Sequence, residues 1–96
     1  MSPNVTVHLP AYIARHKGRS VFQVEMPPGS LVRDLLLRLS TECDSRFADL
    51  VEKGTAGNLW INNLLLTGRR LELPRDLPLQ LNDNDDFCVM YLIGGG

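Results

Sequence analysis

The sequence contains few of the side chains that bind metals or carry out redox chemistry. It has two histidines and two cysteines, which are His8, His16, Cys43 and Cys88. None of them stands in the short CxxC or HxxxH spacing from which zinc sites are usually built. An iron–sulfur cluster needs four cysteine ligands, which the chain does not have. We therefore expect no bound metal, and we expect both cysteines to be small buried or half-buried residues.

Neither sign of charge is in excess, and no hydrophobic run is long. Ten Lys and Arg stand against eleven Asp and Glu, a formal net charge of −1, whereas nucleic-acid-binding domains are usually clearly basic. The apolar run 35–37 ends at Arg38, far short of the ~20 residues that cross a bilayer. The opening segment Met1–Asn4 lacks the basic and apolar parts of a signal peptide. We therefore expect a cytoplasmic protein with reduced thiols and no membrane or nucleic-acid partner.

Residues arranged for catalysis are missing as well. The chain shows no nucleophile–base pair and no glycine-rich phosphate loop. The acidic segment 82–86 is similar to a calcium loop but lacks its glycine and its distal glutamate. We therefore expect a non-enzymatic protein with no catalytic residues and no bound cofactor.

What the sequence does contain is a clear alternation of strand and helix patterns. Two short segments, 5–9 and 20–25, alternate apolar and polar residues and predict a strand hairpin around the polar turn 15–19. The segment Pro27–Ser30 then ends the sheet, and Ser30 is a good N-cap for a helix that begins at Leu31. Residues at helical spacing form one apolar stripe on it: Val32, Leu35, Leu36, Leu39 and Cys43. Leu37 lies off this stripe.

The second half of the chain predicts a shorter helix followed by three strands. Asp44 is a candidate cap for the short helix, with Phe47, Leu50 and Val51 facing inward. The predicted strands are 59–61, 70–73 and 86–92. Because 87–93 contains no charged residue, we expect the last strand in the middle of a mixed sheet. The order of elements indicates an α+β fold with helices on one face.

The run Gly94–Gly96 follows this strand directly. Glycine loses more backbone entropy on ordering than any other residue, so it adds little to a folded end. It is useful where a backbone must be thin and approach another molecule closely. We therefore divide the chain into a domain of residues 1–93 and a tail of residues 94–96. The alternative is a frayed end without a role.

Several motifs together carry a resemblance that covers almost the whole chain. They are the helix opening 27–36, the pair Ile61-Asn62, the acidic turn 81–86 and the terminal glycines. The chain resembles the ubiquitin-like β-grasp sulfur carriers, most of all the small subunit of molybdopterin synthase, with the thiamine-pathway carrier ThiS as a near relative. The resemblance implies a β-grasp fold with a mixed sheet of four to five strands, one main helix and a short second helix.

The sequence departs from this pattern at three places. Asn84 stands where the family usually has glycine, and asparagine tolerates the left-handed backbone that such a turn requires. The segment 91–93 replaces the proline that often precedes the glycines, and the tail has three glycines instead of two.

The resemblance implies a function that depends on the tail. In these carriers an ATP-using enzyme adenylates the terminal carboxylate, and a sulfur donor converts it to a thiocarboxylate that donates sulfur. Gly96 would be the reactive residue, and Gly94 and Gly95 would enter the active site of a partner. Partners would be an adenylating enzyme of the ubiquitin-activating type, a sulfur donor and a larger catalytic synthase subunit.

The same strand predicts an interface, because its residues alternate between two faces. Core residues would alternate with residues on the opposite sheet face, where a partner docks. The expected interface residues are Cys88, Met90, Leu92, Ile93, Asp83 and Asp85. Asp83 and Asp85, with Asp86, equally suit a solvated turn. Molybdopterin synthesis is the expected pathway. The alternatives are a protein modifier conjugated through its terminal glycine, a thiamine-type carrier, and a non-covalent interaction domain.

Overall fold

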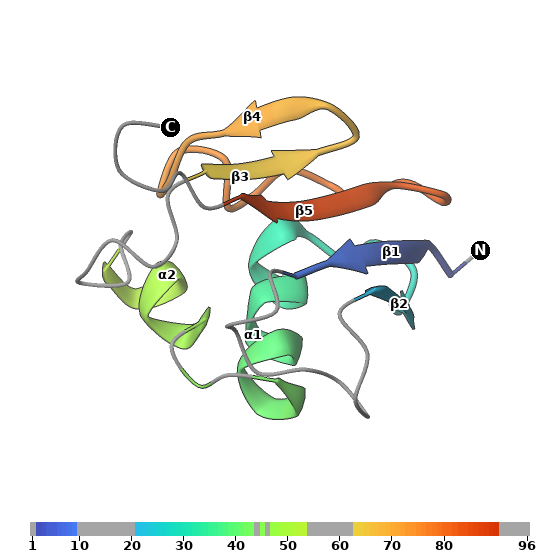
Figure 1. Cartoon of the computed structure of the whole chain (residues 1–96), viewed down its shortest axis with the longest axis horizontal. Helices are drawn as coiled ribbons and strands as arrows, with labels where there is room; N and C mark the ends of the chain where they lie inside the picture. The colour runs from blue at the N-terminus through green and yellow to red at the C-terminus, as the bar shows by residue number, and fades with distance from the viewer. Residues whose placement is uncertain (1, 10–20, 44, 46, 54–62, 91–96) are drawn as a thin grey trace.

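The computed structural model of the protein describes residues 2–9, 21–43, 45, 47–53 and 63–90. Five strands form one sheet: β1 (Asn4–His8), β2 (Val21–Glu25), β3 (Asn63–Leu66), β4 (Arg69–Leu71) and β5 (Asp86–Met90). The helices α1 (Val32–Glu42) and α2 (Phe47–Lys53) lie on the same side of the sheet (Figure 1). The predicted α+β fold, with a main helix and a short second helix, is confirmed.

The strand order in the sheet is β2-β1-β5-β3-β4. Strand β5 runs parallel to β1 and antiparallel to β3, so the sheet is mixed and its last strand is central. The absence of charge beyond Asp86 predicted this position, because a central strand is covered on both edges and buried on at least one face. Residues 91 and 92 of the predicted strand lie outside the described residues.

The core lies between the sheet and α1. Alternate residues of the strands point into it, among them Val5 and Val7 of β1 and Phe87 of β5, each 0% exposed. The apolar stripe of α1 packs against them, as the 3.6-residue period predicted. Phe47 and Leu50 of α2 are buried as predicted, and Val51 and Cys43 are partly buried against the same core. Leu37, off the stripe, is 40% exposed.

The start of α1 corrects one prediction. Leu31, rather than Ser30, is the N-cap residue, and its backbone N–H donates to the Asp34 carboxylate at 2.8 Å. The Ser30 hydroxyl instead donates to the Pro27 carbonyl oxygen at 2.7 Å. Ser30 thus closes the turn before the helix. A carboxylate at the third helical position thus satisfies the backbone N–H of the N-cap residue, which is one half of a capping box.

The strand pair after the helices also differs from the prediction. The predicted strand 59–61 and the Asp44 cap lie outside the described residues, as does the predicted turn 15–19. Strand β3 begins at Asn63, and the turn to β4 consists of Thr67 (φ 49°) and Gly68 (φ 80°). Two consecutive positive φ angles are typical of the two-residue hairpin turns whose twist matches that of the strands. Strand β4 ends at Leu71 instead of residue 73.

Asp76 fixes the turn that follows β4. Its carboxylate accepts the Glu72 backbone N–H at 2.8 Å and forms ion pairs with Arg75 and Arg69 at 3.6 and 3.7 Å. The Glu72 hydrogen bond, and then the two guanidinium groups, lower the pKa of Asp76, while burial of the carboxyl acts in the opposite direction. The ionised carboxylate therefore stabilises this turn.

Candidate functional site: the open sheet face and the tail

The face of the sheet away from the helices carries a row of side chains that crosses all five strands. The strand registers place Val21, His8, Cys88, Leu65 and Arg70 side by side. Val21 is 51% exposed, and Cys88 and Leu65 are half-buried. We call these five residues the Cys88 row. Cys88 and Leu65 form an apolar pair in it, with His8 on one side and Arg70 on the other.

Polarity increases along β5 in the direction away from the tail. The next row contains Gln23, Thr6 and Asp86 and is polar throughout. His8 Nε2 lies 3.5 Å from the Asp86 carboxylate and connects the two rows. The apolar part of the open face is therefore the part nearest the end of β5, from which the chain continues to the glycines. The Met90 side chain lies outside the described part of the structure.

Cys88 contributes to this face as an uncharged thiol. Burial, and secondarily the negative charge of Asp86, raise the pKa of the Cys88 thiol. A raised pKa disfavours the thiolate, which is the nucleophilic form of cysteine. Cys88 is therefore a small apolar element of the open face, as expected for a half-buried free cysteine.

The acidic turn is tied into the fold by its own carboxylates. Asp85 is 7% exposed; its two oxygens accept the Thr67 hydroxyl at 2.6 Å and the Asn82 backbone N–H at 2.7 Å. The exposed Asp83 carboxylate accepts the Asn4 backbone N–H at 2.9 Å. Asn84 has φ 68°, which confirms the left-handed position expected for it. The predicted contact of Asp83 and Asp85 with a partner stays a prediction, and Asp85 already uses both oxygens within the domain.

No metal centre is formed by the part of the chain that the structure describes. Among residues 2–9, 21–43, 45, 47–53 and 63–90, no group of three His, Cys, Asp or Glu side chains is placed to hold a metal ion. No helix in the described part of the chain is long and apolar enough to cross a membrane. What these residues offer is a surface, adjacent to the strand that leads to the tail.

Solved structures share this fold. The solution structure of the Haloferax volcanii HVO 2177 protein matches with a TM-score of 0.68 and 22% identity, over 99% of this chain and 88% of that one. A putative molybdopterin converting factor, subunit 1, from Pyrococcus furiosus matches with a TM-score of 0.66 and 18% identity, over 96% of this chain and 100% of that one. The small archaeal modifier protein 1 (SAMP1) from Methanosarcina acetivorans matches with a TM-score of 0.66 and 22% identity, over 100% and 99%.

The chain has the ubiquitin-like β-grasp fold. The predicted resemblance is thereby confirmed in its fold. No protein-family model and no curated protein matches the sequence.

In this β-grasp fold, β5 is the strand that residues 91–96 follow in the sequence. It pairs with β1 at Thr6, Val7 and His8 and with β3 over the four pairs from Leu66 to Asn63. The strand is therefore paired on both edges, and its last described residue, Met90, still pairs with Asn63. Leu92, Ile93 and Gly94–Gly96 lie outside the described residues, so their predicted roles stay predictions.

Only one strand of the open face was predicted from the sequence. The alternation of β5 predicted Cys88 and Met90 as interface residues, but no sequence pattern assigned Val21, His8, Leu65 and Arg70 to this face. Each of these also follows the period-2 alternation of its own strand. The signal that they share is the register between strands, which becomes available only when the sheet order is known.

Proposed function

We propose that this β-grasp domain is a sulfur carrier that is activated at the carboxylate of Gly96. The observation that carries the proposal is the position of β5, which is central, paired on both edges and followed in the sequence by a segment that ends in three glycines. The likeness to a putative molybdopterin converting factor subunit supports molybdopterin synthesis as the pathway. The domain would act in the cytoplasm and would contribute no catalytic residue of its own.

Activation of the carboxylate proceeds in two steps, and transfer of the sulfur follows. A carboxylate oxygen of Gly96 attacks the α-phosphorus of ATP in the partner's active site, and pyrophosphate leaves. Hydrosulfide supplied by the sulfur donor then attacks the acyl carbon, AMP and a proton leave, and the terminal thiocarboxylate remains. The thiocarboxylate transfers its sulfur to the acceptor, and a carboxylate is restored by water. ATP is thus a substrate of the activating enzyme and not a ligand of this domain.

The glycines suit this chemistry for steric reasons. Without a Cβ, Gly96 does not obstruct the approach of a nucleophile to the acyl carbon. Three extended residues span roughly 10 Å, so the segment Gly94–Gly96 enters a narrow channel while the folded body remains outside. Ordering these residues costs conformational entropy, which contacts made by the body must offset.

The open sheet face supplies those contacts in our proposal. The Cys88 row presents Leu65 beside the Cys88 thiol near the end of β5, and His8 separates this pair from the exposed Val21. An apolar centre with polar groups at its margin is the composition expected of a transient protein interface. The adenylating enzyme and a larger catalytic synthase subunit would both bind here, one after the other.

Incubation of the protein with ATP, its cognate adenylating enzyme and sulfide tests the proposal. The intact mass should rise by the difference between sulfur and oxygen, and fragmentation should place the change at Gly96. The variant that lacks Gly96 should keep its mass. Leu65→Asp should retain the fold but form the product more slowly. The absence of both adenylate and thiocarboxylate from the full chain would contradict the proposal.

A protein modifier is the second candidate function, and the likeness to the small archaeal modifier protein 1 favours it. The activation step is the same, but a lysine amine attacks the acyl carbon and forms an isopeptide bond. Covalent conjugates that disappear when Gly95 and Gly96 are deleted would support this role. A thiamine-type carrier shares the thiocarboxylate and differs in its acceptor, so the accepting enzyme distinguishes it.

A further inference from the structure

Strand β4 carries two successive arginines that lie on opposite faces of the sheet. Arg69 stands opposite the buried Leu66 in the register, and its Nη2 lies 3.7 Å from the Asp76 carboxylate. Arg70 stands opposite Leu65 and is exposed on the open face. It forms no ion pair with any residue in the described part of the chain. Arg69 thus contributes to the fold through Asp76, whereas Arg70 presents its charge on the surface.

The carboxylates along the chain and across the sheet from Arg70 already have other partners. Glu72, the next carboxylate in the sequence, lies 3.8 Å from Arg75. Asp86, on the same face of the sheet, lies 3.5 Å from His8. Strand geometry puts the Cα atoms of Arg70 and Asp86 roughly 12 Å apart, beyond the screening length of about 8 Å at physiological ionic strength. The described carboxylates of the open face therefore leave the charge of Arg70 unbalanced.

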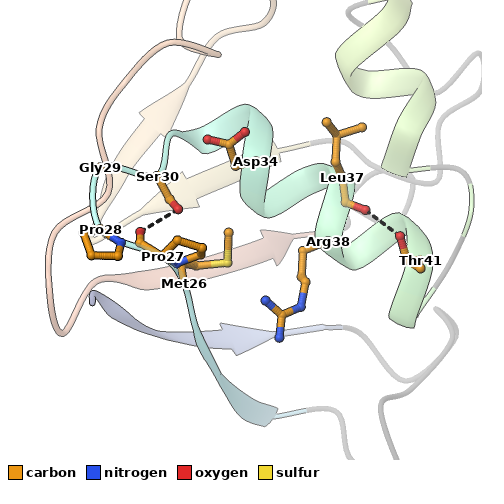
Figure 2. Close-up of a pocket in the computed structure, with 9 residues that line it drawn as sticks. All are labelled: Met26, Pro27, Pro28, Gly29, Ser30, Asp34, Leu37, Arg38 and Thr41. Atoms are coloured by element: carbon orange, nitrogen blue, oxygen red, sulfur yellow. Dashed lines mark hydrogen bonds between the residues drawn. The ribbon is translucent and has the colours of Figure 1, made fainter. Parts of the chain in front are cut away.

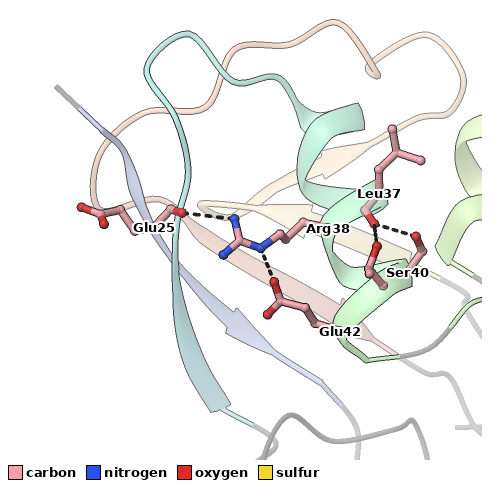
Figure 3. A network of polar contacts seen from close by, with 6 residues as sticks. Glu25, Leu37, Arg38, Ser40 and Glu42 are labelled. Atoms are coloured by element: carbon pink, nitrogen blue, oxygen red, sulfur yellow. Dashed lines mark hydrogen bonds and ion pairs between the residues drawn. The ribbon is translucent and has the colours of Figure 1, made fainter.

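The hollow beside α1 differs from the open face, because its polar side chains are matched within the chain. It measures about 560 Å³ and lies between the connection Met26–Ser30 and α1 (Figure 2). Four polar side chains line it, and each has a partner: Ser30 bonds to the Pro27 carbonyl oxygen, Asp34 to the Leu31 N–H, Arg38 to Glu42, and Thr41 to the Leu37 carbonyl oxygen (Figures 2 and 3). The described lining of the hollow therefore offers no unpaired charge to a ligand.

A partner that docks on the open face changes the environment of Arg70. The guanidinium belongs to the same row as Leu65 and Cys88. A partner that covers this apolar pair also removes water from Arg70, and burial of an unpaired charge is unfavourable. A carboxylate on the partner offsets this cost, because it forms two parallel hydrogen bonds with a guanidinium. An acidic partner group opposite β4 therefore favours docking, and a basic group there opposes it.

We propose that Arg70 is a specificity-determining residue that binds a carboxylate of the activating enzyme. The inference rests on the proposed function, and it names the chemistry that the enzyme presents at the β4 end of the Cys88 row: an aspartate or glutamate side chain. Arg70 is a docking residue and takes no part in the reaction at Gly96. The contact selects among partners, because an enzyme with a lysine or arginine at that place is repelled.

ATP–pyrophosphate exchange with the full chain as the varied substrate tests the proposal, since it needs no sulfur donor. Arg70→Glu should raise the KM of the adenylating enzyme about thirtyfold and leave kcat unchanged, because the contact is the same before and during the reaction. Arg70→Lys should raise the KM only about threefold, since it keeps the charge and loses the bidentate geometry. The effect of Arg70→Glu should decrease as the salt concentration rises.

Arg33→Glu is the matched control. Arg33 is exposed on α1, on the other side of the sheet, and it forms no ion pair with any residue that the structure describes (Figure 1). The substitution changes the net charge as much as Arg70→Glu does, and its KM should stay within about twofold of the wild-type value. An unchanged KM for Arg70→Glu, or an equal rise for Arg33→Glu, would overturn the proposal.

Charge reversal in the enzyme identifies the group that Arg70 binds. Among enzyme variants in which one surface carboxylate is replaced by arginine, one should be impaired with the wild-type chain and restored with Arg70→Glu. Restoration by none of them would overturn the proposal, because a carboxylate is the group that it names. If Arg70→Glu does not fold, Arg70→Gln replaces it, with a KM about tenfold above that of the wild type. Its Tm should equal the wild-type value.

The outcomes separate this proposal from the proposed function. Absence of exchange with the wild-type chain would overturn both. Normal exchange with the wild-type chain and an unchanged KM for Arg70→Glu would overturn the role of Arg70 alone and leave the carrier function in place.

Discussion

Replacing Asp85 by alanine tests whether the acidic turn serves the fold or a partner. The substitution removes both acceptors used by the Thr67 hydroxyl and the Asn82 backbone N–H. Hydrogen bonds to a charged acceptor contribute about 1.5 kcal/mol or more each, so Asp85→Ala should lower the free energy of unfolding by about 3 kcal/mol. That is a large part of the roughly 5–15 kcal/mol that a domain of this size has in total.

Urea unfolding followed by circular dichroism measures this loss, and thermal unfolding should show a decrease in Tm of roughly 10–20 °C. Asp83→Ala is the matched control in the same turn. Its exposed carboxylate accepts one backbone N–H, that of Asn4, so its loss should cost only about 0.5 kcal/mol. If Asp85→Ala is as stable as Asp83→Ala but binds the adenylating enzyme much more weakly, the reasoning is refuted and Asp85 belongs to the interface.

Three further predictions concern charge, the thiol and the open face. The pKa of Asp76 is lower in the folded than in the unfolded protein. The ionised carboxylate therefore stabilises the fold at neutral pH, and this stabilisation is lost as the pH falls below about 4. Over that pH range, the urea concentration at the unfolding midpoint should change less for Asp76→Asn than for the wild type. Because the pKa of Cys88 is raised, iodoacetamide at pH 8 should alkylate it more slowly than it alkylates the cysteine of a short unfolded peptide. Asp86→Asn should accelerate the alkylation of Cys88, which a mass-spectrometric time course measures. Leu65→Asp should raise the KM of the adenylating enzyme about tenfold or more, with the Tm of the variant measured as its control.

Local patterns predicted much of the fold. The absence of charge after Asp86 predicted the central strand, and the 3.6-residue stripe predicted the buried face of α1. The predicted ends of helices and strands were less accurate where a side chain forms a hydrogen bond with an unexpected partner. Ser30 has the chemistry of an N-cap, yet its hydroxyl bonds to Pro27 while Asp34 satisfies the Leu31 donor. Several local partners compete for such a group, and the sequence does not rank them.

The candidate site depended more on contacts between distant segments. The tail was evident from Gly94–Gly96 themselves. The Cys88 row was not, because it requires the register of β1, β3 and β5. The structural role of Asp85 was hidden for the same reason: Thr67, its partner, lies in a different turn, 18 residues earlier. The Thr67-Gly68 turn joins β3 to β4, whereas the sequence predicted only one strand, 70–73, in this part of the chain.

Intact-mass analysis of the chain purified from its native host tests the central claim most directly. The account predicts a fraction of molecules in which one terminal oxygen of Gly96 is replaced by sulfur, and predicts that this fraction disappears when the gene of the adenylating enzyme is deleted. A population that carries only an unmodified carboxylate at Gly96, identical with and without that enzyme, would contradict the account.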